Sequence, residues 1–125
     1  MRTERDIWRY RSELDLSVDL TGFEIEALDG GIGKVDEWTD EVNASFVVVD
    51  TGPWIFGKKV MLPAGVIDRV DYDTETVFVD RTKEQIKNAP EFDESSYREQ
   101  RYRSELGTYY GEGGHGYRER TGDVL

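Results

Sequence analysis

Hydrophobic and polar residues alternate along the first half of the chain. In residues 14–20, leucine and valine alternate with aspartate and serine, and residues 23–27 repeat the pattern with glutamate at the polar positions. A period of two is typical of a strand with one buried face. A turn at residues 29–31 and a return strand over residues 32–39 are expected to follow. Gly33, near the start of that return strand, indicates a bulge or a tight bend.

The strongest strand signal lies in residues 45–63. Four apolar residues, Phe46 to Val49, precede a break at Asp50-Thr51-Gly52-Pro53, and a second apolar run, Val60 to Leu62, ends at Pro63. Two strand-forming runs on either side of a glycine and proline turn predict an antiparallel hairpin.

Shorter elements follow this hairpin. A strand within residues 66–72, a turn at 73–75 and a strand over 76–79 are expected. A helix over residues 83–88 is expected next, because Thr82 and Gln85 have the spacing of a capping box. The chain is therefore predicted to be mostly β, with five or six short strands in a small antiparallel barrel or rolled sheet and a short C-terminal helix.

Both ends of the chain are more polar and are expected to be flexible. Ile7, Tyr10 and Leu14 fall on one face of a short helix, with Trp8 off that face. This arm is either frayed and tucked against the body or a partner-binding segment.

The other end has a different composition. Residues 97–106 are predicted to form a mostly charged helix, and the glycine-rich residues from Gly107 onward are predicted to be disordered. Tyrosine and arginine alternate there, a pattern that can stack on bases. Because the segment is itself acidic overall, a protein partner or packing onto the barrel is the alternative to disorder.

Charge changes the functional picture. The net charge of the 125-residue chain is −11, and residues 21–93 hold 7 basic and 16 acidic side chains, a net −9. An acidic body repels phosphate backbones, so no direct nucleic-acid binding is expected. The absence of cysteine excludes disulfides and thiolate chemistry. No apolar run approaches the roughly 20 residues of a membrane span, so a cytoplasmic protein is expected.

Candidate chemistry is sparse. The single histidine, His115, lies among glycines and is interpreted as solvated. The run Gly30-Gly31-Ile32-Gly33-Lys34 lacks the spacing and the following Ser or Thr of a phosphate loop, and is interpreted as a turn entering a strand. Residues 71–75 have alternating side-chain oxygens, but they lack the mid-loop glycine and the bidentate glutamate that ends a twelve-residue calcium loop. They are interpreted as a hairpin turn. No catalytic, cofactor-binding or metal-binding residue is therefore predicted.

The one candidate binding site is aromatic. Trp54, Ile55 and Phe56 lie together in the turn of the central hairpin. They either close one end of the barrel or contact a protein partner or a second copy of the chain, because aromatic residues are favoured in interface cores.

Residues 20–93 resemble the PRC-barrel family, which includes the cytoplasmic part of the photosynthetic reaction centre H subunit and the C-terminal domain of a ribosome maturation factor. The sequence pieces that carry the resemblance follow one another in order: Leu20-Thr21-Gly22-Phe23, Asp29 to Asp36-Glu37, Phe46 to Gly52, Lys58 to Pro63, Val77-Phe78-Val79, Glu84 to Lys87 and Ala89-Pro90-Glu91. The resemblance implies a small β-barrel with a scaffolding or adaptor role and no shared catalytic residues.

These observations divide the chain into an arm (1–19), a PRC-barrel domain (20–93) and a Tyr/Arg/Gly-rich tail (94–125). The first functional hypothesis is a non-enzymatic protein-binding or scaffold module that self-associates as a homo-oligomer. The alternatives are a ribosome-assembly accessory that binds a basic ribosomal protein, and an enzyme that uses carboxylates or a metal.

Overall fold

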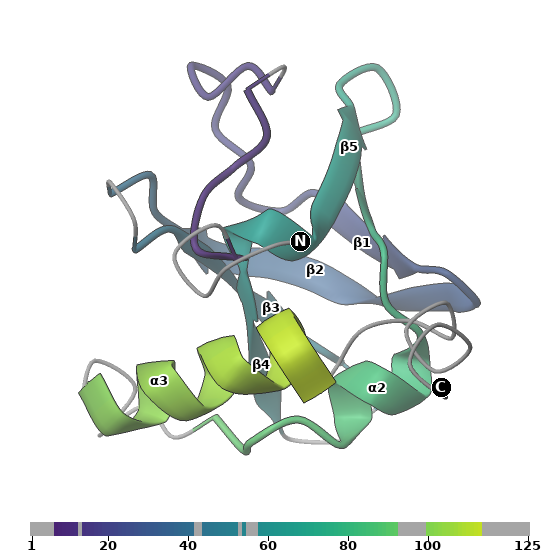
Figure 1. The fold of residues 1–125 in the computed structure, drawn as a ribbon. Helices are drawn as coiled ribbons and strands as arrows, with labels where there is room; N and C mark the ends of the chain where they lie inside the picture. The colour runs from purple at the N-terminus through teal and green to yellow at the C-terminus, as the bar shows by residue number, and fades with distance from the viewer. Residues whose placement is uncertain are drawn as a thin grey trace, which may run out of the picture.

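The computed structural model describes residues 7–12, 14–41, 44–52, 54, 58–92 and 100–113, with the side chains of residues 112 and 113 left out. Its elements are, in order, β1 (Glu24–Ala27), β2 (Gly30–Trp38), β3 (Phe46–Asp50), β4 (Lys59–Pro63), the 3-10 turn η1 (Ala64–Val66), β5 (Ile67–Asp71), β6 (Thr76–Val79), α2 (Lys83–Lys87), α3 (Gln100–Thr108) and the π-helical turn η2 (Tyr109–Gly113). The six strands form one sheet in the order β4-β3-β2-β1-β6-β5, so the mostly β prediction is confirmed (Figure 1).

The predicted hairpins are confirmed. Strand β3 pairs antiparallel with β4 from Asp50 opposite Lys59 to Phe46 opposite Pro63. Strands β1 with β2, and β5 with β6, are also antiparallel neighbours. The prediction of a wholly antiparallel sheet is wrong, however, because the first strand, β1, and the last strand, β6, pair in parallel. The sheet is mixed.

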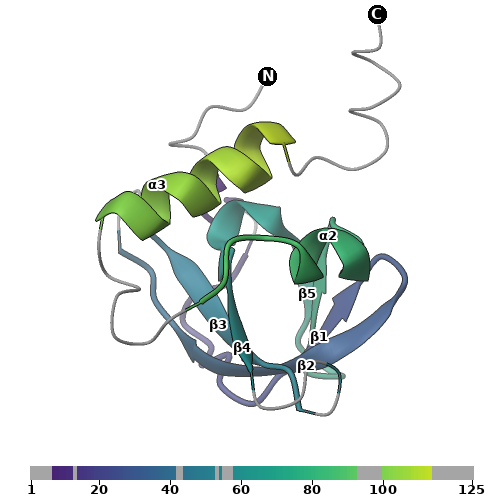
Figure 2. The same ribbon diagram turned by 90° about the horizontal axis from the view of Figure 1, so that it is seen from below.

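The sheet is rolled but not closed, so the predicted barrel is not confirmed. Its two edge strands, β4 and β5, follow each other in the chain through only the three residues of η1. Four Cα steps of at most about 3.8 Å keep Pro63 and Ile67 close, and Figure 2 shows the resulting curl. The pairing register shifts at three places, in β1–β2, β2–β3 and β5–β6. Such bulges bend strands and increase their twist, which rolls the sheet.

The strand predicted for residues 14–20 is wrong. Burial does alternate there, with half-buried Leu14, Leu16 and Val18 separated by exposed residues, but the segment forms turns. The carboxylates of Asp15 and Asp19 accept backbone N–H groups two residues further on, at 3.0 Å each. Aspartate side chains that bond their own backbone compete with strand pairing.

The helix predicted at residues 83–88 is confirmed as α2. The Thr82 hydroxyl accepts the Gln85 N–H, and the Gln85 side chain accepts the Thr82 N–H, which completes the predicted capping box. The helix predicted at 97–106 is confirmed over residues 100–106, which belong to α3, and residues 97–99 lie outside the described residues. The prediction of disorder from Gly107 onward is wrong for residues 107–113, because residues 107–108 belong to α3 and residues 109–113 form η2.

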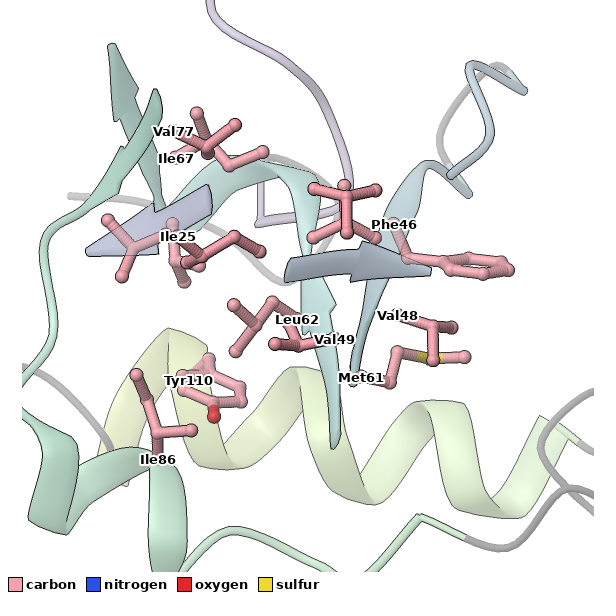
Figure 3. Close-up of a cluster of buried hydrophobic side chains, with 14 of the residues drawn as sticks. Ile25, Phe46, Val48, Val49, Met61, Leu62, Ile67, Val77, Ile86 and Tyr110 are labelled. Atoms are coloured by element: carbon pink, nitrogen blue, oxygen red, sulfur yellow. The ribbon is translucent and has the colours of Figure 1, made fainter. Parts of the chain in front are cut away.

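Side chains from the arm, the sheet and α3 share one hydrophobic core. The arm contributes Ile7 and Trp8, and the C-terminal helical segment contributes Tyr102, Leu106 and Tyr110. Trp8 is only 6% exposed and Tyr10 is half-buried against the core, so the arm is tucked against the body, one of the two outcomes that the sequence left open. Figure 3 shows Tyr110 facing the strand residues of this core. The roll is therefore filled by side chains.

Candidate functional site

Trp54 is the part of the predicted aromatic site that the structure describes. Its backbone N–H donates to the Thr51 carbonyl at 3.1 Å, and its half-buried ring packs against the hydrophobic core. Ile55 and Phe56 lie outside the described residues. Trp54 thus packs in part on the core, and a contact with a partner or a second copy stays a prediction.

Lys83 connects this ring to two other parts of the chain. The Lys83 ammonium lies 5.4 Å from the Trp54 ring centroid, a cation–π distance. The Lys83 backbone N–H donates to Asp29 Oδ1 at 2.8 Å. Lys83 therefore links the first turn of α2 to both the β1–β2 turn and the loop after β3.

The β1–β2 turn also carries Leu28, which is 56% exposed. Among the residues that the structure describes, no other large hydrophobic side chain is exposed. Its backbone N–H donates to the Arg81 carbonyl at 2.9 Å, which fixes the turn against the start of α2. We call Leu28, Asp29, Trp54 and Lys83 the Trp54 surface. It consists of two apolar side chains, one anion and one cation.

Leu28 was missed in the sequence, although a signal exists. Phe23, Ile25 and Ala27 alternate inward along β1 and all three are buried. Leu28 follows Ala27 directly, so it falls out of phase with the buried face. A large apolar residue out of phase with a confirmed strand is a candidate contact residue.

Two arginines that sequence reasoning also missed attach α3 to the body. Arg81 is 5% exposed, and its Nη2 donates to the Tyr110 carbonyl at 2.8 Å. Arg103 places its guanidinium carbon 4.9 Å from the Trp8 ring centroid and 5.2 Å from that of Phe46. Its Nη2 donates to the Ala44 carbonyl at 2.9 Å. The C-terminal helical segment is therefore held by directed contacts as well as by apolar packing.

The other chemical motifs form ordinary strands and turns. Residues 30–34 belong to β2, as interpreted from the sequence. Asp71 accepts the backbone N–H groups of Asp73 and Thr74 at 3.0 and 3.1 Å, so residues 71–75 form the predicted hairpin turn. His115 lies outside the described residues. Within the described part of the chain, no cluster of three or more His, Cys, Asp or Glu side chains is placed to hold a metal ion.

Burial raises the pKa of three tyrosines, Tyr10, Tyr102 and Tyr110, far above the usual value near 10. For Tyr10 the neighbouring Asp40 carboxylate adds to the effect. A raised pKa in the folded state favours the neutral phenol. The contribution of these buried phenols to the free energy of unfolding is therefore fully present below about pH 10, and it is lost as the pH rises above that value.

We expect alkaline titration to show this coupling. Of the seven tyrosines, these three should ionise only as the protein unfolds, so part of the tyrosinate absorbance should appear together with loss of the circular dichroism signal. In denaturant all seven should titrate near pH 10. Complete ionisation near pH 10 with a native circular dichroism spectrum would contradict the buried positions.

Comparison with models of known protein families finds no match, and a search of curated proteins finds no similar sequence. The resemblance to the PRC-barrel family therefore stays a prediction. Among the described residues, no helix is both long and apolar enough to cross a membrane.

Proposed function

We propose that this protein is a non-enzymatic binding module that associates with a second copy of itself through the Trp54 surface. The observation that carries the proposal is the exposure of Leu28 in a turn that is tied to Lys83, the residue whose ammonium lies 5.4 Å from the half-buried Trp54 ring. Scattered exposed apolar residues are common on proteins. Here Lys83 connects the turn of the exposed leucine to an aromatic ring, and aromatic residues are favoured in interface cores.

The charges of the surface support a symmetric contact. A two-fold interface brings the same patch of both copies together, so it needs groups that complement themselves. Asp29 and Lys83 supply one charge of each sign within the patch, joined by the hydrogen bond at the start of α2. Each copy can therefore offer its cation to the other copy's anion.

A rolled, side-chain-filled sheet that acts through its surface also agrees with the adaptor role that the PRC-barrel resemblance implies. The closed barrel of that family, and membership of it, are part of this proposal. The second candidate is a basic protein partner, such as the ribosomal protein expected from the resemblance. It is favoured by the net −9 of residues 21–93.

Salt separates the two candidates. Two copies with a net charge of −11 each repel one another, so screening should strengthen self-association. An acidic protein and a basic partner attract, so salt should weaken that complex. We expect sedimentation velocity to show a dimer whose dissociation constant falls as sodium chloride is raised from low to physiological concentration.

The variant Leu28→Asp tests the surface itself. Because Leu28 is exposed, the fold should be retained while the dimer weakens by about tenfold or more, the loss expected for an apolar anchor worth over 1 kcal/mol. Asp73→Asn, in the exposed β5–β6 turn, is the control and should leave association unchanged. A monomer at every salt concentration, or a dimer insensitive to Leu28→Asp, would refute self-association through this surface. Binding to a basic protein that weakens with salt and depends on Leu28 would favour the second candidate.

A further inference from the structure

A pocket of about 230 Å³ lies between β4 and the segment that follows α2. Met61 contributes from the sheet, Ile86 from α2, and Pro90 and Phe92 from the following segment. A cavity of about 150 Å³ is large enough to hold benzene, whereas drug-sized ligands occupy about 300 Å³ or more. The volume therefore suits a molecule with one ring and a few further atoms. This pocket is separate from the Trp54 surface.

One wall of the pocket holds a polar group without a partner. Tyr110 lines the pocket and is fully buried, and its hydroxyl has no hydrogen-bond partner among the residues that the structure describes. Figure 3 shows this hydroxyl directed toward the space between Ile86 and Met61, which line the same pocket. Buried hydroxyls nearly always have a partner, and an exception calls for an explanation. A polar ligand atom that enters from the pocket supplies one.

Met61 lines the same pocket as Tyr110. Tyr110 is 0% exposed, so water does not reach it. Met61 is also buried, but its unbranched thioether side chain has three rotatable bonds and adapts readily to a neighbouring group. Because Met61, Phe92 and Tyr110 line one pocket, an aromatic ring bound there can pack against the sulfur and against Phe92.

The lining of the pocket has more basic than acidic side chains, in an otherwise acidic protein. Three of the five lysines of the chain, Lys58, Lys59 and Lys87, line the pocket together with one acid, Glu91. Lys58 forms an ion pair with Glu91, and Lys59 lies 3.1 Å from Asp36. Lys87 is exposed at the end of α2. Because Lys58 and Lys59 are already paired with carboxylates, Lys87 is the lining cation that favours a ligand with an anionic end.

We propose that this pocket binds a small aromatic carboxylate that carries a hydrogen-bonding group at the end opposite the carboxylate. The ring occupies the apolar space, the carboxylate lies toward the lysines, and the distal polar group pairs with the Tyr110 hydroxyl. This inference does not depend on self-association, because it rests on different residues.

The test uses 4-hydroxybenzoate as the probe, with benzoate and 4-hydroxybenzyl alcohol as matched compounds that lack the hydroxyl or the charge. Two-dimensional NMR of the full chain should show saturable shifts at Met61 and Ile86. The dissociation constant for 4-hydroxybenzoate should be about 3 to 10 times lower than for either matched compound. Absence of saturable shifts, or shifts confined to the Trp54 surface, would overturn the proposal.

Two variants separate binding from folding. Tyr110→Phe removes a hydroxyl that has no partner among the described residues, so the free protein should be at least as stable as the original. The same variant should lose its preference for 4-hydroxybenzoate over benzoate. Lys87→Gln should weaken the binding of both carboxylates but not that of the alcohol. Lys34→Gln, in β2 and outside the pocket lining, should leave the binding of all three compounds unchanged. An unchanged preference in Tyr110→Phe, or equal effects of the two lysine variants, would refute the assigned pose.

Discussion

Replacing Gly33 with alanine is expected to destabilise the protein by about 4 kcal/mol or more, the range reached only by severe substitutions. Gly33 has φ +145°, a conformation that residues with a Cβ rarely adopt. A Cβ at this position would lie 2.1 Å from the Asp50 carbonyl oxygen and 2.9 Å from Thr51 Cα. These are backbone atoms at the end of β3, so no side-chain rotation relieves the contact.

Two other glycines provide controls that separate the clash from the backbone strain. Gly22 has φ +88°, and no atom of the described residues lies within 4 Å of the place that a Cβ would take, so Gly22→Ala should cost only the strain, about 1–2 kcal/mol. Gly31 has no positive φ, and its nearest neighbour is the Glu26 carboxylate at 3.4 Å, so Gly31→Ala should change stability by about 1 kcal/mol or less. Urea unfolding monitored by tryptophan fluorescence measures all three. If Gly33→Ala lowered the free energy of unfolding no more than Gly22→Ala does, the close approach of Gly33 in β2 to the end of β3 would be refuted.

Gly33 also illustrates what the sequence can predict. A glycine inside a strand pattern indicates a bulge, and the β1–β2 register does shift beside Gly33, between Ile25 and Glu26. The hairpins were predictable for a similar reason, since each joins neighbouring strands through a turn whose residues are visible in the sequence. Local turn signals specify pairing between consecutive strands and nothing beyond them.

The parallel pairing of β1 with β6 illustrates what the sequence cannot predict. These strands are separated by about 50 residues, with Glu24 opposite Thr76 and Glu26 opposite Phe78. Nothing local to either strand specifies the other. The pairing follows from the bulges that roll the sheet and bring its later strands back to β1. In residues 14–20 the sequence predicted a strand that does not form. Alternation there correctly indicates partial burial of every second side chain, but it does not supply a neighbouring strand to pair with.

The candidate site was predictable only in part. Trp54 was identified because an aromatic residue in a glycine-rich turn is unusual, but Lys83, which lies over its ring, and the turn of Leu28, which is tied to Lys83 through Asp29, come from distant parts of the chain. The lysine-lined pocket draws on β4, α2 and the segment after it. Such a pocket exists only after folding. Arg103 was hidden for another reason: hydrophobic patterning treats it as a solvated charge, whereas it packs between the aromatic rings of Trp8 and Phe46.

The second large effect is expected from Leu106→Ala, which should destabilise the protein by about 3 kcal/mol. Leu106 is 0% exposed and lies between Tyr102 and Tyr110 on the buried face of the C-terminal helical segment. Its side chain is therefore part of the shared core of arm, sheet and helix. Removing three carbons leaves a cavity that the neighbours, held by Arg81 and Arg103, cannot readily fill. Ser104→Ala, on the exposed side of α3, is the matched control and should change stability by less than about 0.5 kcal/mol.

This comparison decides whether the C-terminal helical segment is part of the folded body or an independent appendage. From the sequence, a charged helix followed by glycines predicted marginal order. The structure instead places Tyr110 at the centre of the core, so α3 should unfold together with the sheet. Thermal unfolding of Leu106→Ala should therefore give one cooperative transition at a lower temperature, seen equally by far-ultraviolet circular dichroism and by tryptophan fluorescence. An early loss of helix signal with an unchanged fluorescence transition would show that α3 detaches by itself, and it would also remove Tyr110 from the wall of the proposed ligand pocket.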